Sequence, residues 1–564
     1  MASLVAKDVR GRRYWQIVTC QRVHGKPRQV VLAHLGTADR LLEKLQQGKP
    51  VQGRVLQFGL LAAAWKLARD LSLVELIDEH VRKRDQGPSV GQYLLLAALN
   101  RLVQPSSKAR LADWYQKTGL RRWLPLRRAA LRSQRFWDHM DAVDEQAISR
   151  IEAELSRRLV ERYAIDLRCL CFDCTNFDTF INSQTAAELP QRGHAKSKRT
   201  DLRVVGLALL VSTDFNIPLF SNVYAGNQPD AVTFASVSEA LVQRYRLLAR
   251  ELEHVTLVFD KGNNSQDNLA ALADSPYHVV GSLVPTQHPE LLAVPLRHFR
   301  RLRQRRLKGV TAYRTTKEVY GKSWTLVVTR SNSLLNGQLR GIAQHLRKRR
   351  RALADLQAKL RRSQQPGAKG KGYTLESLQR HAKQLSQGQY LKDILRIDVR
   401  WRRGRLSLRY RTDAPALAKL QRTVLGKRIL FTDNHDWCTA EIILAYRSQH
   451  HVEATFRQMK DPACLSWEPM HHWTDSKIRV HSFYCVLALT LLNLLHRQAW
   501  QAGLHISSRC LRDELGSIQE VIHLYPSSSD GRAGRYRAQT TYSVETPTAR
   551  RLADIFGLAE LQID

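Results

Sequence analysis

Short apolar runs alternate with helical patterns between residues 166 and 283, and this is the clearest signal along the chain. Continuous apolar runs of this length are typical of strands buried on both faces. Three such runs follow one another directly, and helical patterns at 230–250 and 265–273 separate the later ones. The order predicts an α/β fold with a mixed sheet, whose strands we expect at 167–175, 202–213, 217–225, 254–260 and 277–284.

The residues before this region divide into a β-rich part and a helical part. Two β-rich runs within 13–35 are joined by a turn that contains Gly25 and Pro27, which predicts a hairpin. From about 56 to 162 the apolar spacing is helical, and Ser89 stands where it would cap a helix. Because the later part of this stretch is rich in Arg and Trp, we expect a basic helical domain that binds DNA.

The stretch 284–435 has strand-like pieces on both sides of a strongly basic middle. Leucines at helical spacing in that middle predict two amphipathic helices that form an antiparallel hairpin at about 341–390. Its basic residues fit a solvated helix face and a DNA-contacting face equally well. The expected strands are 310–316, 324–329, 394–401 and 406–411, and the apolar helix positions are Leu346, Leu353, Leu356, Leu360, Leu375, Leu378, Ala382 and Leu385.

These patterns divide the chain into six regions. We expect an N-terminal β-hairpin region (1–50), a helical DNA-binding domain (51–162), the first part of an α/β core (163–283), a β-rich insertion with the helical hairpin (284–435), the second part of the core (436–500) and a C-terminal region (501–564).

The charge of the chain is the unusual part of its composition. Apolar residues make up 43% of the 564 residues and charged residues 25%, which is ordinary for a folded globular protein. The formal net charge of +38 indicates a polyanionic partner, and nucleic acid is the first candidate. The longest apolar run, at 486–495, is shorter than the ~20 residues of a membrane helix, and the N-terminus lacks a signal-peptide core. We therefore expect a cytoplasmic protein with no membrane association.

Eight cysteines are too few and too scattered for a disulfide framework. Cys171 and Cys174 have the spacing of half a zinc site or of a redox pair, but no second pair completes a tetrahedral site nearby. On a strand, their side chains would also point to opposite faces. We expect both to be structural.

Three acidic residues stand at positions that suggest one shared site. Asp173 ends the first predicted strand and Asp260 the fourth, and a buried carboxylate there must be solvated, paired or metal-bound. Glu453 lies on a later predicted helix. Three carboxylates flanked by cations are what two-metal phosphoryl transfer with Mg²⁺ or Mn²⁺ requires. Residues on the same helix face as Glu453 are Gln449, Arg457 and Lys460, with Tyr446 one turn earlier.

At these residues the sequence resembles the DDE transposases of bacterial insertion sequences that carry a Tyr-x2-Arg-x3-Glu-x6-Lys signature. Tyr446, Glu453 and Lys460 match that spacing, while Gln449 stands where the signature has Arg. The segments around Asp173 and Asp260 resemble the two Asp motifs of the family, and 193–211 and 224–230 resemble the segments between those motifs.

The resemblance implies an RNase H-like core in which Asp173, Asp260 and Glu453 bind two Mg²⁺ or Mn²⁺ ions and catalyse DNA cleavage and strand transfer. It also implies that the partner is double-stranded DNA, namely the terminal inverted repeats and the target DNA. The protein would be a homodimer in the synaptic complex and would be associated with the bacterial nucleoid. The residues that it nominates for DNA contact are Tyr446, Gln449, Arg457, Lys460, His194, Lys198, Arg199 and Trp401.

Some alternatives remain open at the level of sequence. Excision is expected to be cut-and-paste, and the resembled group typically uses a DNA hairpin intermediate, which this sequence neither proves nor excludes. A base flipped out during that step would stack on an aromatic residue of the insertion, Trp324 or Trp401, unless these pack its core. The rival functions are an RNase H-like nuclease that does not join strands and a domesticated, non-catalytic DNA-binding protein.

Overall fold

The structure is a computed structural model that describes residues 2–561 except 24–25, 48–49, 51, 83–86, 183, 249–254, 261–267, 269–276, 368–371, 403 and 527–535. The chain folds into two compact units. The first unit comprises 1–155, 179–187 and 457–564, and the second comprises 156–178 and 188–456.

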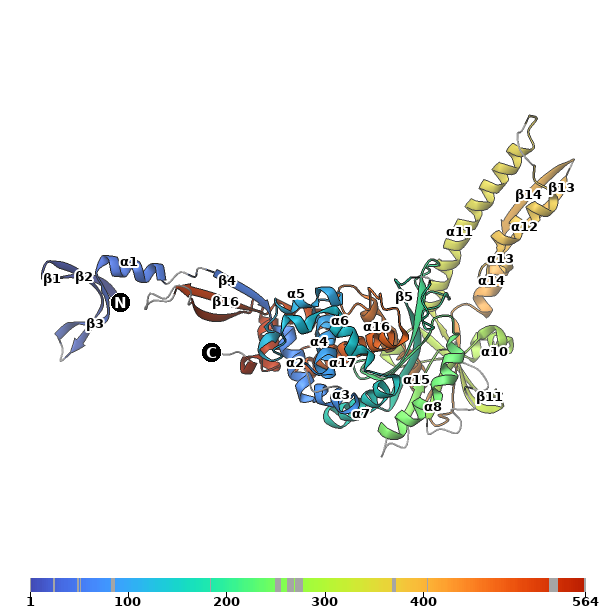
Figure 1. Ribbon diagram of the computed structural model, residues 1–564. Helices are drawn as coiled ribbons and strands as arrows, with labels where there is room; N and C mark the ends of the chain where they lie inside the picture. The colour runs from blue at the N-terminus through green and yellow to red at the C-terminus, as the bar shows by residue number, and fades with distance from the viewer. Residues whose placement is uncertain are drawn as a thin grey trace. The chain divides into compact units, whose positions relative to one another are not determined.

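A nine-stranded mixed sheet forms the centre of the second unit (Figure 1). Its strands follow the order β10-β11-β12-β15-β9-β8-β5-β6-β7. Strand β8 runs parallel to both β5 and β9, whereas β6 and β7 are antiparallel to each other. The strands are β5 (Cys169–Thr179), β6 (Arg203–Ser212), β7 (Pro218–Ala225), β8 (Val255–Val258), β9 (Tyr277–Leu283), β10 (Arg300–Arg301), β11 (Val310–Val319), β12 (Lys322–Ser331) and β15 (Lys427–Thr432).

The strands predicted between 166 and 283 are all present. Nine of the ten residues of β6 are buried, and all four of β8, as expected for central strands covered on both faces. The helix predicted at 230–250 is α8 (Asp230–Leu248). The helix predicted at 265–273 lies outside the described residues, apart from one position.

Of the strands predicted in the insertion 284–435, those at 310–316 and 324–329 join the main sheet, whereas those at 394–401 and 406–411 form a separate two-stranded sheet. β12 pairs with β15, and β15 pairs with β9, so β10, β11, β12 and β15 extend the main sheet. The edge of β9 offers unpaired backbone groups, and β15 satisfies them although about 150 residues of chain lie between the two strands. Trp324 of β12 accordingly packs inside this sheet, with its ring centroid 5.0 Å from that of Phe431.

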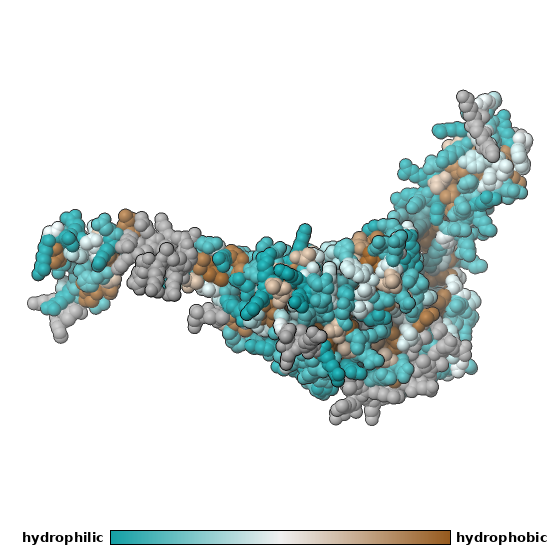
Figure 2. Space-filling view, viewed as in Figure 1, coloured by the Kyte–Doolittle hydropathy of each residue, from teal (hydrophilic) through white to brown (hydrophobic). Residues whose placement is uncertain are grey.

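An arm between β12 and β15 contains the predicted helical hairpin (Figure 1). The predicted leucines pack together, but they also cover a two-stranded ribbon that supplies Leu395, Leu406 and Leu408 to the same core. Figure 2 shows a largely hydrophilic surface on the visible face of this arm. Its elements are α11 (Asn332–Ser363), α12 (Leu375–Ser386), α13 (Leu391–Ile394), β13 (Leu395–Arg402), β14 (Arg405–Thr412) and α14 (Ala414–Thr423).

The first unit contains two small sheets and a helical core. The predicted N-terminal hairpin is present as β2 and β3, and β1 adds a third strand that we did not predict. Ser89 caps α4 through a capping box with Gln92, as predicted. The strands are β1 (Ala2–Val9), β2 (Arg12–Val23), β3 (Lys26–Gly36), β4 (Gln52–Gln57), β16 (Gln519–Pro526) and β17 (Tyr536–Ser543). The principal helices of the unit are α1 (Ala38–Gln47), α2 (Gly59–Asp70), α3 (Leu73–His80), α4 (Val90–Val103), α5 (Leu111–Tyr115), α6 (Ser133–Asp141), α17 (Asp475–Gln501), α18 (Ser508–Ser517) and α19 (Pro547–Ile555).

Helix α17 is longer than the apolar run within it suggested. Its 27 residues include a window with a mean hydropathy of 1.6, which is long and apolar enough to cross a membrane. However, 94% of that window is buried inside the fold, where α17 packs against α2, α4, α6 and α18. The helix is therefore the core element of the first unit.

Trp324 of β12 is buried and Trp401 of β13 is exposed, and together they test the packing of the nine-stranded sheet. Trp324 is 1% exposed and donates from Nε1 to the carbonyl oxygen of Val319 at 3.0 Å, whereas Trp401 is 58% exposed. We expect Trp324→Ala to lower the free energy of unfolding of the second unit by about 3–5 kcal/mol, because a buried cavity would remain. Trp401→Ala should change it by less than about 0.5 kcal/mol. Denaturant unfolding of both variants tests this, and equal losses would contradict the sheet packing of Trp324.

Candidate active site

The two aspartates belong to neighbouring parallel strands. Asp173 is the fifth of the eleven residues of β5, and not its last residue as predicted, while Asp260 follows the end of β8 by two residues. Strand β5 pairs with β8 in a register that sets Cys171 opposite Val258. Continued by two residues, the same register sets Asp173 opposite Asp260, on strands about 4.8 Å apart and with side chains on the same face. The register of the two strands therefore predicts that two carboxylates 87 positions apart in the sequence are neighbours across the sheet.

Two hydroxyl groups hold the carboxylate of Asp260. Tyr446 Oη lies 3.0 Å from Asp260 Oδ1, and Ser282 Oγ lies 3.2 Å from the same oxygen. The two hydroxyl oxygens are 3.0 Å apart, and with one proton each, both can donate to Oδ1. Burial raises the pKa of Tyr446 to about 12, so its hydroxyl remains a neutral donor around neutral pH. We expected Tyr446 to contact DNA, whereas here it is buried behind the carboxylate.

Glu453 and Asp260 line the same cavity, which has a volume of about 470 Å³. Glu453 lies in the first turn of α16 (His450–Lys460) and is exposed, and Gln449 lines the cavity just before the helix begins. Asp173 is not among the lining residues. Cations from β15 and α15 (Thr439–Arg447) also line it, namely Lys427, Arg428 and Arg447.

A buried cysteine connects the first strand to the helix that carries Glu453. The Sγ atom of Cys171 lies 3.2 Å from both the carbonyl oxygen and Oγ of Ser448, which joins α15 to α16. Cys171 precedes Asp173 by two residues on β5, so this contact fixes the start of α16 relative to that strand. The cysteines of the chain that the structure describes are free thiols, and burial raises the pKa of Cys171. Cys171 and Cys174 are both buried, and a structural role for them stays a prediction.

The donor chemistry of these carboxylates fits a hard divalent cation. Among the described residues, the side chain of Glu453 forms no hydrogen bond or ion pair, and Asp260 accepts its side-chain hydrogen bonds only at Oδ1. Glu453 and Oδ2 of Asp260 are therefore available as oxygen ligands. In the described part of the chain, however, no three His, Cys, Asp or Glu side chains are grouped closely enough to hold an ion by themselves.

A basic loop at 191–201 is attached to β5 just beyond Asp173. The Nδ2 atom of Asn176 donates to the carbonyl oxygen of His194 at 2.9 Å, and its Oδ1 accepts from the backbone N–H of Lys196 at 2.9 Å. The Nζ atom of Lys196 donates to the carbonyl oxygen of Cys174, the residue after Asp173. The loop thus places a cation, Lys196, close to Asp173 on β5.

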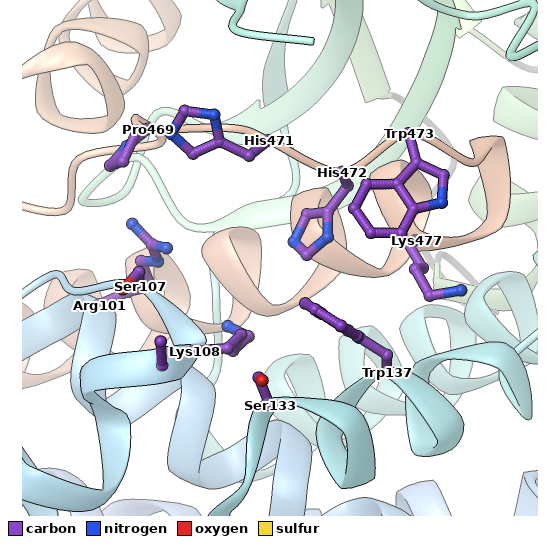
Figure 3. Close-up of a pocket in the computed structure, with 11 residues that line it drawn as sticks. Arg101, Ser107, Lys108, Ser133, Trp137, Pro469, His471, His472, Trp473 and Lys477 are labelled. Atoms are coloured by element: carbon purple, nitrogen blue, oxygen red, sulfur yellow. The ribbon is translucent and has the colours of Figure 1, made fainter. Parts of the chain in front are cut away.

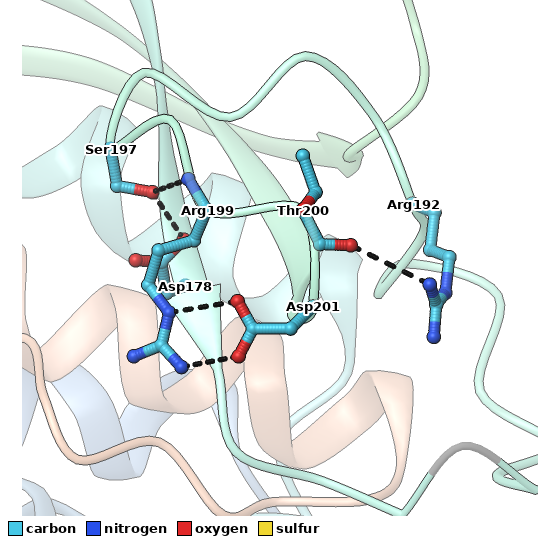
Figure 4. A network of polar contacts seen from close by, with 6 residues as sticks. All are labelled: Asp178, Arg192, Ser197, Arg199, Thr200 and Asp201. Carbon is cyan, nitrogen blue, oxygen red and sulfur yellow. Dashed lines mark hydrogen bonds and ion pairs between the residues drawn. The ribbon is translucent and has the colours of Figure 1, made fainter. Parts of the chain in front are cut away.

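The predicted DNA-contacting residues of this loop are exposed at its surface. His194 and Lys198 are both exposed. Arg199 forms an ion pair with Asp201, and Ser197 Oγ donates to Asp178 at 2.9 Å (Figure 4). Because an exposed ion pair contributes only about 0–1 kcal/mol, Asp201 does not prevent Arg199 from binding a phosphate.

The remaining predicted residues are distributed over other parts of the chain. Arg457 and Lys460 are exposed on α16, in the part that belongs to the first unit. Trp401 is exposed on β13, between Arg400, which pairs with Asp398, and Arg402. Arg403 lies outside the described residues.

The sequence reasoning missed three residues that shape the site. Ser282 lies on β9 and Arg428 on β15, where its guanidinium carbon is 5.0 Å from the centroid of the Tyr446 ring. No pattern around either residue identified it, because strand pairing alone brings it to the site. Lys196 was detectable, since it stands between His194 and Lys198 in the basic segment.

No protein-family model matches this chain, and no curated protein matches it. Among solved structures, the chain is similar to the piggyBac transposase synaptic complex with hairpin DNA, with a TM-score of 0.37 and 9% identity, covering 83% of this chain and 82% of that chain. It is also similar to the Mos1 transposase paired-end complex with the left transposon end, with a TM-score of 0.15 and 13% identity, covering 35% of this chain and 60% of that chain. Both TM-scores are too low to support an argument about function, so the proposal that follows rests on the residues of this chain.

Proposed function

We propose that this protein is a DNA transposase that binds the terminal inverted repeats of an insertion sequence and moves it by cut-and-paste cleavage and strand transfer. The observation that carries the proposal is the parallel register of β5 and β8, which, continued by two residues, sets Asp173 opposite Asp260. Glu453 joins them through the cavity that it shares with Asp260. This is the order of acids that the resemblance to DDE transposases implies.

The proposal includes an RNase H-like core made of β5 to β9. The strand order β7-β6-β5-β8-β9 supports it, because the first strand is central and the fourth and fifth run parallel to it. That order puts the first and fourth strands side by side, which is the requirement for Asp173 and Asp260 to act together.

Asp173, Asp260 and Glu453 would hold two Mg²⁺ or Mn²⁺ ions. Such ions activate the attacking hydroxyl and stabilise the leaving oxygen during phosphoryl transfer. The chain itself supplies the fixed geometry: Tyr446 and Ser282 orient the carboxylate of Asp260 with neutral hydrogen bonds, which leave its negative charge available for cations.

The partner in this proposal is double-stranded DNA, bound by a homodimer. The net charge of +38 supports a polyanionic partner. His194, Lys198 and Arg199 would contact the backbone near the acids, and Arg457 and Lys460 would do so from α16. Gln449 occupies the position of the signature Arg, where its amide can donate a hydrogen bond to a phosphate but contributes no charge. We assign recognition of the repeat sequence to the N-terminal region, residues 1–162.

The first test replaces single acids. We expect Asp260→Asn and Asp173→Asn each to reduce cleavage and joining of DNA that flanks the gene by at least about a hundredfold in Mg²⁺, because a metal ligand is lost. DNA binding should be nearly unchanged. The matched control is Asp436→Asn, which alters an exposed carboxylate outside the cavity. Full activity in either variant would exclude that acid from the mechanism.

The same assays on the parent protein separate the rival functions. Cleavage without joining would identify a nuclease, and binding without cleavage would identify a domesticated, non-catalytic DNA-binding protein.

The second test separates two roles for Tyr446. If its hydroxyl orients Asp260, Tyr446→Phe should lower cleavage about 10–100-fold and raise the Mg²⁺ concentration required, with unchanged DNA affinity. Ser282→Ala should have the same kind of effect. Cleavage titrations in Mg²⁺ and a binding assay without metal measure the two quantities. A loss of DNA affinity with normal metal dependence would instead assign Tyr446 to DNA contact.

The third test concerns the arm. Arg347, Lys348 and Arg350 are exposed on α11. If they contact phosphates, changing each to Gln should reduce the slope of log K against log salt by about 0.9. Titrations of the full-length protein with duplex DNA at several salt concentrations measure the slope. If the triple variant has the same slope as the parent protein, these residues belong to a solvated helix face.

A further inference from the structure

A small cavity in the first unit has cations in its wall but no acidic residue. It has a volume of about 190 Å³ and lies between α4, α6 and the segment that leads into α17 (Figure 3). Among its lining residues are Arg101, Lys108, Trp137, His472, Trp473 and Lys477. In the described part of the chain, no Asp or Glu lines it.

Two of these cations are buried around one neutral ring. Lys108 is 8% exposed, and its Nζ donates to Tyr484 Oη at 3.0 Å and lies 4.2 Å from the centroid of that ring. Arg101 is 2% exposed, with its guanidinium carbon 6.0 Å from the same centroid. The guanidinium donates only to backbone carbonyl oxygens, and its Nε has no hydrogen-bond partner among the described residues.

This arrangement lacks a negative charge. Burial of a cation is costly unless an anion compensates it, and no carboxylate among the described residues lines the cavity. Burial and the neighbouring Arg101 accordingly lower the pKa of Lys108 well below its ordinary value. Lys477 is different, because both of its contacts at 2.6 and 2.8 Å go to the carboxylate of Asp141. Burial and the neighbouring Lys108 and Arg101 lower the pKa of His472 to about 3, so this imidazole is neutral at pH 7. An anion that enters the cavity would compensate Lys108 and Arg101.

Two tryptophans of the cavity, Trp137 and Trp473, indicate that the ligand has a flat ring in addition to its negative charge. The rings of Trp137 and Trp473 meet at a centroid distance of 5.7 Å and an angle of 63°, and Trp473 is 56% exposed although it is a large apolar residue. Exposed tryptophan faces bind flat rings by stacking. The cavity is smaller than the ~300–1,000 Å³ of sites for drug-sized molecules, which restricts the ring system to about the size of one base.

We propose that this cavity binds one nucleotide, with its phosphate at Lys108 and Arg101 and its base against Trp137 and Trp473. Two sources share this chemistry: an unpaired nucleotide within bound DNA, and a free nucleoside monophosphate. The first source rests on the proposed function, whereas the second does not.

The experiment measures binding by the full-length protein without metal, so it does not depend on catalysis. The probes are 2-aminopurine deoxyribonucleoside 5′-monophosphate, the same nucleoside without phosphate, and a duplex that carries one unpaired 2-aminopurine. Stacking on tryptophan should quench the fluorescence of 2-aminopurine. The variants are Trp473→Ala, Lys108→Met and, as a matched control, Trp500→Ala, which removes an exposed tryptophan that does not line the cavity.

We expect saturable quenching of the monophosphate or of the unpaired base in the parent and in Trp500→Ala. Affinity should fall roughly tenfold or more in Trp473→Ala. Removal of the phosphate should weaken binding to the parent roughly tenfold but weaken binding to Lys108→Met by a smaller factor, since only Arg101 remains there to bind the phosphate. Thermal melts of each variant confirm folding, and Trp473 is exposed enough for its loss to be tolerated.

Each outcome either supports or overturns the proposed nucleotide site. Quenching of the monophosphate alone identifies a free nucleotide as the ligand, and quenching of the unpaired base alone identifies DNA. Absence of quenching with both probes, or equal quenching in parent and Trp473→Ala, overturns the proposal. A protein that fails to cleave DNA but passes this test would refute the proposed function and leave the nucleotide site standing.

Discussion

The parallel register of β5, β8 and β9 is the constraint on which the rest of the candidate site depends. β8 is buried along its length, whereas β5 carries the partly exposed Asp173 in its middle. Continued by two residues beyond the paired positions, the register sets Asp173 opposite Asp260, and Asp260 lies beside Ser282 of β9. A shift of one residue in either pairing would turn one carboxylate to the opposite face of the sheet.

Neutral groups hold Asp260 and the start of the helix that carries Glu453. The hydroxyls of Tyr446 and Ser282 hold Asp260, and the thiol of Cys171 contacts Ser448 at the start of the helix that carries Glu453. A buried Arg or Lys in any of these places would neutralise the carboxylates and lower their affinity for a cation. The protein thus keeps its many cations around the site, on the basic loop and on β15, while the carboxylates keep their negative charge.

The positive charge of the chain has two different settings. Most of it lies on exposed surfaces such as α11, where solvent and salt screen it and where a flexible polyanion can be bound without a fixed geometry. At Arg101 and Lys108 it is buried, screening is weak, and an anion would be bound in a defined position. For the proposed ligands, the first setting would contribute affinity, and the second would contribute selectivity for the shape of the ligand.

The sequence by itself determined the elements and the candidate acids. Apolar runs identified β5 to β9, leucine spacing identified α11 and α12, and strand ends together with helix spacing nominated Asp173, Asp260 and Glu453. These features are local, since they depend on neighbours within one or two turns or along one strand. Periodicity of this kind is visible in a single sequence.

Only the tertiary structure decided which of these elements meet. The pairing of β15 with β9 incorporated the expected insertion strands into the main sheet, and it brought Arg428 over the ring of Tyr446. Tyr446 became the buried partner of Asp260 because its helix packs on the sheet, although its spacing from Glu453 suggested an exposed contact with DNA. The β15–β9 pairing and the Tyr446–Asp260 contact join residues more than 100 positions apart, and backbone hydrogen bonds between strands carry no residue-specific signal from which they could be predicted.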